Sequence, residues 1–124
     1  MEYLPDTNVF SRIFQSNFVI RQFVETRNCA IDTTIYIECL QGSKSNYEKR
    51  LIEKYLLRFP VIPMTPTTSN LAVDLIRTYS NSHGLLLADA QIAATALEND
   101  LTVLTYNIAD FQFINDLKCE KPPS

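Results

Sequence analysis

Hydrophobic positions along the chain alternate between short apolar runs and longer stretches with helical spacing. The short runs predict strands over residues 2–4, 29–31, 61–62 and 101–105. The helically spaced stretches predict helices over residues 9–14, 18–25, 35–40, 43–58, 69–79 and 89–97. Beyond Phe111 we expect a small helix and an edge strand before Cys119.

Strands that alternate with helices predict a parallel sheet covered on both faces. We therefore expect an α/β fold: a three-layer α/β/α domain with a mainly parallel sheet of four to five strands. The 124 residues are enough for one domain with its own core, and no linker or repeat interrupts them. We expect a single domain over residues 1–119 and a frayed tail over residues 120–124.

Polar side chains stand where the predicted strands end. Asp6 follows the first strand, Asn107 and Asp110 follow the strand over residues 101–105, and Asp89 begins the alanine-rich helix. Because a parallel sheet gathers its functional groups at the carboxyl ends of the strands, we expect these side chains at one edge.

Two of the acidic residues also have a purely structural interpretation. Asp6, Thr7 and Asn8 are all good helix caps, so Asp6 could serve as a cap, a site residue or both. Glu38 lies among apolar neighbours in a predicted helix. Its carboxylate therefore either lies on an exposed face of that helix or is buried because it has a functional role.

The composition limits the class of protein and the kind of metal site. With 46% hydrophobic and 20% charged residues the chain is a folded globule, and no apolar run approaches the ~20 residues that span a bilayer. The N-terminus has no basic region before an apolar run, so we expect no signal peptide, no membrane and a cytoplasmic location. The single histidine, His83, excludes a zinc site built from several histidines.

The net charge of −3 and pI near 5.0 are the opposite of a typical nucleic-acid binder. One helix nevertheless carries Arg50, Lys54 and Arg58 at four-residue spacing. This stripe is either a solvated face or a contact for a phosphate backbone.

Several carboxylates at one edge without a histidine among them would repel one another. A hard divalent cation would relieve that repulsion, because such ions prefer oxygen ligands. The chemistry that follows is metal-assisted hydrolysis of a phosphodiester.

Four segments resemble the PIN domain, specifically the VapC-like toxin ribonucleases of bacterial and archaeal type II toxin–antitoxin pairs. They have the family's order and spacing, cover nearly the whole chain, and read YLPDTNVF over 3–10, IDTTIYIECLQG over 31–42, LADAQIAATA over 87–96 and LTYNIADF over 104–111. Pro5 departs from the family, which usually has an aliphatic residue at that position.

The resemblance implies an endoribonuclease that depends on Mg²⁺ or Mn²⁺. It implies an acidic core that holds the ion and activates water, made of Asp6, Glu38 and Asp89, with Asn107 at the fourth catalytic position. It further implies supporting roles for four neighbours, Thr7, Asn8, Thr105 and Asp110.

The resemblance also implies partners. We expect a homodimer, an RNA substrate, and a VapB-like antitoxin whose C-terminal segment covers the site with a basic side chain. RNA contacts are expected at local basic residues, namely Arg12, Arg50, Lys54 and Arg58.

Other functions fit less well or stay open. A haloacid-dehalogenase-type phosphatase needs a second aspartate where this chain has Asn8, and a receiver domain needs a lysine that residues 101–110 lack. A PIN-like module that binds protein or RNA without catalysis remains the alternative.

Overall fold

The computed structural model describes residues 1–123, which form five strands, six α-helices and one short 3₁₀ helix. In chain order these are β1 (Tyr3–Pro5), α1 (Thr7–Phe14), α2 (Phe18–Thr26), β2 (Ile31–Asp32), α3 (Thr33–Gln41), α4 (Asn46–Leu56), β3 (Val61–Ile62), α5 (Pro66–His83), α6 (Leu87–Asn99), β4 (Thr102–Leu104), η1 (Ile108–Asp110) and β5 (Cys119–Glu120). Within this part of the chain, no helix is both long and apolar enough to cross a membrane.

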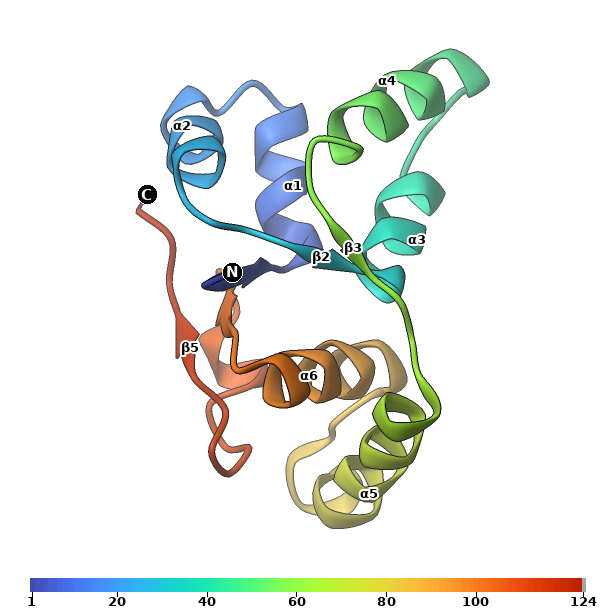
Figure 1. Cartoon of the computed structure of the whole chain (residues 1–124), viewed down its shortest axis with the longest axis vertical. Helices are drawn as coiled ribbons and strands as arrows, with labels where there is room; N and C mark the ends of the chain where they lie inside the picture. The colour runs from blue at the N-terminus through green and yellow to red at the C-terminus, as the bar shows by residue number, and fades with distance from the viewer. Residues whose placement is uncertain (124) are drawn as a thin grey trace.

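The strands form two parallel groups, β1-β4-β5 and β2-β3. An isolated parallel bridge between Tyr3 and Cys29 joins them edge to edge. Helices α1 to α4 lie on one side of the strands, and α5 and α6 lie on the other (Figure 1). The predicted three-layer α/β/α fold with a parallel sheet is therefore confirmed.

Pro5 explains why the two groups of strands meet at so few residues. Tyr3 uses both its backbone groups toward the β2 side: its N–H donates to the Asn28 carbonyl at 3.2 Å, and its carbonyl accepts from Ala30 at 3.0 Å. Pro5 is the next residue of β1 that faces β2, and it has no N–H to donate. The ladder between β1 and β2 ends there, whereas Asp6 still donates to the Leu104 carbonyl of β4 at 2.8 Å.

Helix α6 forms the centre of the layer beneath the sheet. Its alanines at 90, 93, 94 and 96 are buried, and the helix packs against α5 and β4. Small side chains allow this close approach of helix and sheet. The polar Thr95 is buried with them at 1% exposure, so its hydroxyl needs a partner inside the protein.

Several boundaries differ from the predicted ones. Helix α5 starts earlier because Thr65 and Thr68 form a capping box around Pro66, and it ends at Gly84, whose φ of 71° suits glycine. The second strand lies over Ile31–Asp32 rather than residues 29–31. Glu120, expected in the tail, is the last residue of β5, and Ser124 lies outside the described residues.

Candidate active site

Asp6 is held at the point where β1 becomes α1. One of its carboxylate oxygens, Oδ1, accepts from the backbone N–H of Thr7 at 2.7 Å, so Asp6 is the N-cap of α1. The other, Oδ2, accepts from Thr105 Oγ1 at 3.0 Å, at the end of the neighbouring strand β4. Burial raises the pKa of Asp6, and these two hydrogen bonds oppose the rise. Asp6 is thus a cap whose second oxygen is fixed at the carboxyl ends of two paired strands.

Glu38 reaches this point from α3. Its Oε1 accepts from Thr7 Oγ1 at 2.7 Å, and its side chain is partly buried. Glu38 also contributes to the raised pKa of Asp6 through its negative charge. The carboxylate therefore lies beside the start of α1, and the apolar neighbours that surround it in the sequence belong to other faces of α3.

Thr105 organises the strand end on the other side of Asp6. Its buried hydroxyl donates to Asp6 and accepts from two groups, Asn8 Nδ2 at 3.2 Å and the backbone N–H of Asn107 at 3.0 Å. Asn8 in turn accepts from the backbone N–H of Tyr106 at 3.4 Å. The bonds from Asn8 and Thr105 fix the backbone of the turn after β4, and Asn107 itself is exposed at its tip.

Asp89 stands in the first turn of α6 and is partly buried. Burial, followed by the negative charges of Asp6, Asp110 and Glu38, raises the pKa of Asp89 to about 7. No hydrogen bond to its carboxylate contributes to that value. The structure thus brings Asp6, Asp110 and Glu38 near enough for their charges to act on Asp89, although their elements are far apart in the sequence.

These residues fit Mg²⁺ or Mn²⁺ by donor chemistry. All four offer carboxylate oxygens, and a cation among them would offset the repulsion that, in addition to burial, raises the pKa of Asp89. Over residues 1–123, no group of three or more His, Cys, Asp or Glu side chains is close enough to hold an ion directly. Because Mg²⁺ usually keeps several waters, the arrangement suits an ion held by one or two carboxylates with water completing its shell.

Arg12 lies next to this turn. Its guanidinium carbon is 3.9 Å from the centre of the Tyr106 ring, a stacking distance for a cation on an aromatic face. Tyr106 directly precedes Asn107, so Arg12 places a positive charge at the margin of the acidic site.

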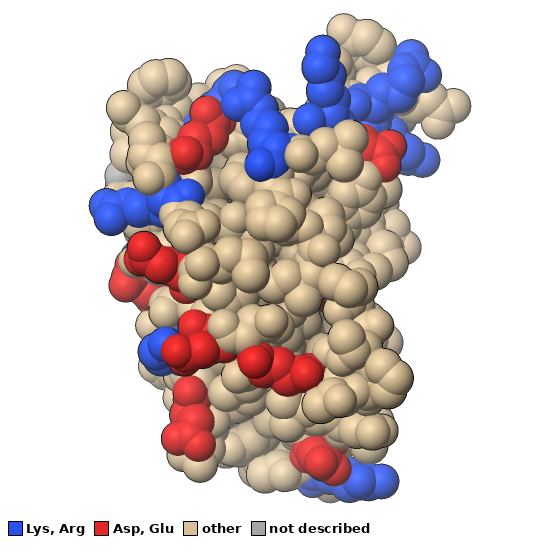
Figure 2. All heavy atoms as spheres, viewed as in Figure 1, with Lys and Arg blue, Asp and Glu red and all other residues tan. Residues whose placement is uncertain are grey.

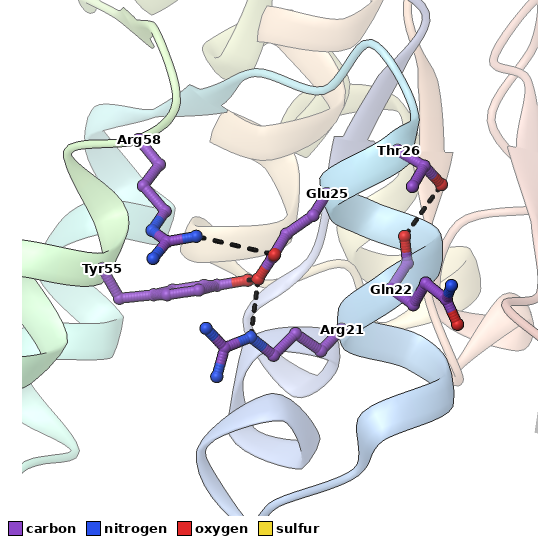
Figure 3. A network of polar contacts seen from close by, with 6 residues as sticks. All are labelled: Arg21, Gln22, Glu25, Thr26, Tyr55 and Arg58. Carbon is purple, nitrogen blue, oxygen red and sulfur yellow. Dashed lines mark hydrogen bonds and ion pairs between the residues drawn. The ribbon is translucent and has the colours of Figure 1, made fainter.

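Arg58 is engaged by a network that joins α2 to the end of α4 (Figure 3). Glu25 accepts from Tyr55 Oη at 2.8 Å and from Arg21 Nε at 2.7 Å, and its other oxygen is 3.5 Å from Arg58. Both guanidinium carbons lie 5.2 Å from the centre of the Tyr55 ring. Arg58 therefore already has an anionic partner and differs in its surroundings from the rest of the predicted basic stripe.

Arg50 and Lys54 point into solvent on α4. Lys and Arg side chains gather over α2 and α4 at one end of the molecule, whereas Asp and Glu are more frequent over the lower half of the same view (Figure 2). The two residues are thus part of a basic end of the protein. None of the described hydrogen bonds or ion pairs connects them to the acidic site.

A cavity of about 750 Å³ opens between α1, α3 and α4 and reaches the acidic site. Thr7 and Glu38 line one end, and Ile13, Leu51 and Ile52 give it an apolar wall. Such a mixed lining suits a polypeptide segment with one apolar face. The sequence alone did not predict this cavity, because its walls come from four separate helices, with Arg21 of α2 contributing as well.

Comparison with known proteins gives three kinds of match. The PIN domain family model matches residues 3–113. Ribonuclease VapC10 of Mycobacterium tuberculosis (strain CDC 1551 / Oshkosh) is 36% identical over 80 residues, which is 64% of this chain and 60% of that protein. A toxin–antitoxin complex from Klebsiella pneumoniae aligns with a TM-score of 0.79 and 26% identity over 94% of this chain and 95% of the other. DNA-bound VapBC from Salmonella typhimurium aligns with a TM-score of 0.81 over 98% of both chains, and at 22% identity it supports the fold alone.

Proposed function

Since the chain belongs to the PIN domain family, we propose that it is a metal-dependent endoribonuclease, the toxin of a toxin–antitoxin pair. The observation that carries the proposal is the convergence of Asp6, Glu38, Asp89 and Asp110: burial, together with the negative charges of the other three, raises the pKa of Asp89 to about 7. Carboxylates that repel one another in this way are a suitable site for a divalent cation.

One or two of Asp6, Glu38 and Asp89 would hold Mg²⁺ or Mn²⁺ directly, and water molecules would complete the shell and connect the ion to the remaining carboxylate. When bound, the ion supplies positive charge beside a phosphate oxygen and makes a water molecule a better nucleophile. Asn107, exposed at the end of β4, would orient the substrate or a water by hydrogen bonds.

The neighbouring side chains keep these groups in place. Thr7 donates to Glu38, Thr105 donates to Asp6, and Asn8 holds Thr105. Each hydrogen bond limits the rotation of one catalytic or supporting side chain, and fixed geometry of this kind is a large part of enzymatic rate enhancement. Asp110 adds negative charge at the rim and would assist in attracting the ion.

RNA binding would depend on the ion and on basic side chains around the site. Arg12, stacked on Tyr106, is the candidate beside the site, and Arg50 and Lys54 are candidates at the basic end. We place Arg58 lower among these candidates because it is already paired with Glu25.

The proposal is tested by cleavage of a labelled total-RNA pool in the presence of Mn²⁺, Mg²⁺ or EDTA. We expect discrete products that need the metal and that disappear with Asp6→Ala. The exposed Asp74→Asn variant is the matched control and should cut as the wild type does. A folded, partner-free protein that cuts with neither metal would instead support a PIN-like module that only binds protein or RNA.

The cavity between α1, α3 and α4 is the proposed place for a VapB-like antitoxin segment. Its apolar wall would take the apolar face of that segment, and Glu38 at its end would meet a basic side chain. We expect Leu51→Asp, which places a charge on this wall, to weaken binding of the cognate antitoxin without changing RNA cleavage by the free toxin. Equal antitoxin affinity in this variant would place the partner elsewhere. We also propose a homodimer, which light scattering of the partner-free protein tests.

A further inference from the structure

A second strand-end aspartate is buried more deeply than Asp6. Asp32 ends β2 and caps α3, and only 1% of it is exposed. Its Oδ1 accepts from the backbone N–H of Ile35 at 2.8 Å, which is the ordinary capping bond. Its Oδ2 accepts from Thr95 Oγ1 of α6 at 3.0 Å. The partner on α6 is 63 residues further along the chain, so no local sequence pattern indicates this second contact.

A parallel contact reinforces this connection between the helices. Thr34, next to the start of α3, donates from Oγ1 to Gln91 Oε1 on α6 at 3.0 Å. Thr95 also lies 3.1 Å from the Gln91 carbonyl, so its hydroxyl can turn toward its own helix. Two side-chain hydrogen bonds thus join α3 to α6 behind the acidic site.

The two joined helices carry two of the proposed metal-holding residues. Glu38 follows Asp32 on α3, and Asp89 precedes Thr95 on α6. Over residues 1–123, no strand pairing joins β2, which leads into α3, to β4, which follows α6, whereas Asp6 is fixed by the backbone pairing of β1 with β4. The relative position of Glu38 and Asp89 therefore depends on how α3 packs against α6.

Capping alone does not account for a side chain of this length at this position. Serine caps a helix as well as aspartate does, without the cost of burying a charge. The longer side chain of Asp32 carries a second polar atom, which reaches Thr95 on α6 while the first one caps α3. A serine cap would leave this contact between α3 and α6 unmade.

We propose that Asp32 is a positioning residue: through Thr95 it fixes α3 against α6 and so sets the spacing between Glu38 and Asp89. The inference rests on the proposed function, because that spacing matters for an ion shared by the two carboxylates. Residues behind a metal site that orient its ligands commonly change metal affinity by ~10- to 100-fold when they are lost.

Three substitutions separate the connection from the cap and from the charge. Asp32→Ser keeps the cap but cannot reach α6, and Thr95→Val keeps the cap but removes the donor. Asp32→Asn keeps both, since its amide can donate to Thr95 while the threonine hydroxyl turns to the Gln91 carbonyl. Val24→Ala, a fully buried position in α2, is the control for a general loss of stability.

Mn²⁺ affinity by titration calorimetry, and kcat and KM for RNA at saturating Mn²⁺, are measured for each variant. We expect Asp32→Ser and Thr95→Val to bind Mn²⁺ about tenfold more weakly and to lose about tenfold in kcat with KM unchanged. We expect Asp32→Asn to match the wild type in both. Melting temperatures identify any variant that is simply unfolded under the assay conditions.

Three results would overturn the inference, and they differ from one another. Asp32→Ser and Thr95→Val that bind Mn²⁺ and cut RNA as Val24→Ala does would show that the site does not depend on the connection. Asp32→Asn that loses as much as Asp32→Ser would show that the charge matters and the connection does not. A wild-type protein that neither binds Mn²⁺ nor cuts RNA would refute the proposed function, and this inference with it.

Discussion

Replacing Asp89 with asparagine should stabilise the metal-free protein above neutral pH. Burial and the charges of Asp6, Asp110 and Glu38 raise the pKa of Asp89 from 3.8 to about 7. Between these two values the unfolded chain has released the proton and the folded chain still holds it, so stability falls as pH rises through this interval. Below the interval Asp89 costs nothing, and above it the full cost remains.

The size of the effect follows from the change in pKa. A rise of about three pKa units corresponds to ~4 kcal/mol if the group were fully shielded from solvent. Asp89 is only partly buried, so solvent screening reduces the expected loss to ~1–2 kcal/mol. For a domain of this size, that is a difference in melting temperature of ~3–8 °C.

The assay is thermal unfolding in EDTA at pH 4 and pH 8. We expect Asp89→Asn to melt at the wild-type temperature at pH 4 and several degrees above it at pH 8. In millimolar Mn²⁺ at pH 8 the order should reverse, because the wild type gains stability from the bound ion and the variant gains less.

The matched control is Asp74→Asn, which changes an exposed aspartate on α5 whose partner is Arg77. It should melt as the wild type does under all these conditions. A variant at position 89 whose difference from wild type is the same at pH 4 and pH 8 would show that neither burial nor the other three carboxylates raise the pKa of Asp89. The electrostatic basis of the site would then be wrong.

Three further substitutions test the surroundings of the site. Thr7→Val removes the hydrogen bond to Glu38, and we expect about a tenfold loss of kcat with little change in KM; unchanged kcat would mean that Glu38 needs no such support. Tyr55→Phe removes one hydrogen bond to Glu25, and chemical denaturation should show that the free energy of unfolding falls by about 1 kcal/mol. RNA cleavage should stay at the wild-type rate; slower cleavage would give the network around Glu25 a direct role in catalysis. Asn107→Asp adds a carboxylate at the end of β4, which calorimetry should register as roughly threefold tighter Mn²⁺ binding; weaker binding would place this side chain away from the ion.

Local patterns in the sequence predicted most of the fold and the acidic residues. Strand and helix periodicity reports which faces are buried, and the strand-end position of Asp6 follows from it directly. Local periodicity could not show that Arg58 has an anionic partner, because that partner, Glu25, belongs to a different helix. Tyr55, one turn before Arg58, also binds Glu25. Local periodicity also could not find the partner of Asp32, since no spacing rule relates a helix cap to a buried threonine far along the chain.

The acidic residues differ in how firmly the protein holds them, and this difference connects the pH prediction with the role of Asp32. Asp6 is fixed by strand pairing and two hydrogen bonds, and Glu38 by the hydroxyl of Thr7. Asp89 has no such bond contributing to its pKa, so its position depends on α6 as a whole. A carboxylate placed only by its helix is sensitive both to neighbouring charges and to any shift of that helix. The connection from Asp32 to α6 acts on the one carboxylate that the rest of the site leaves least constrained.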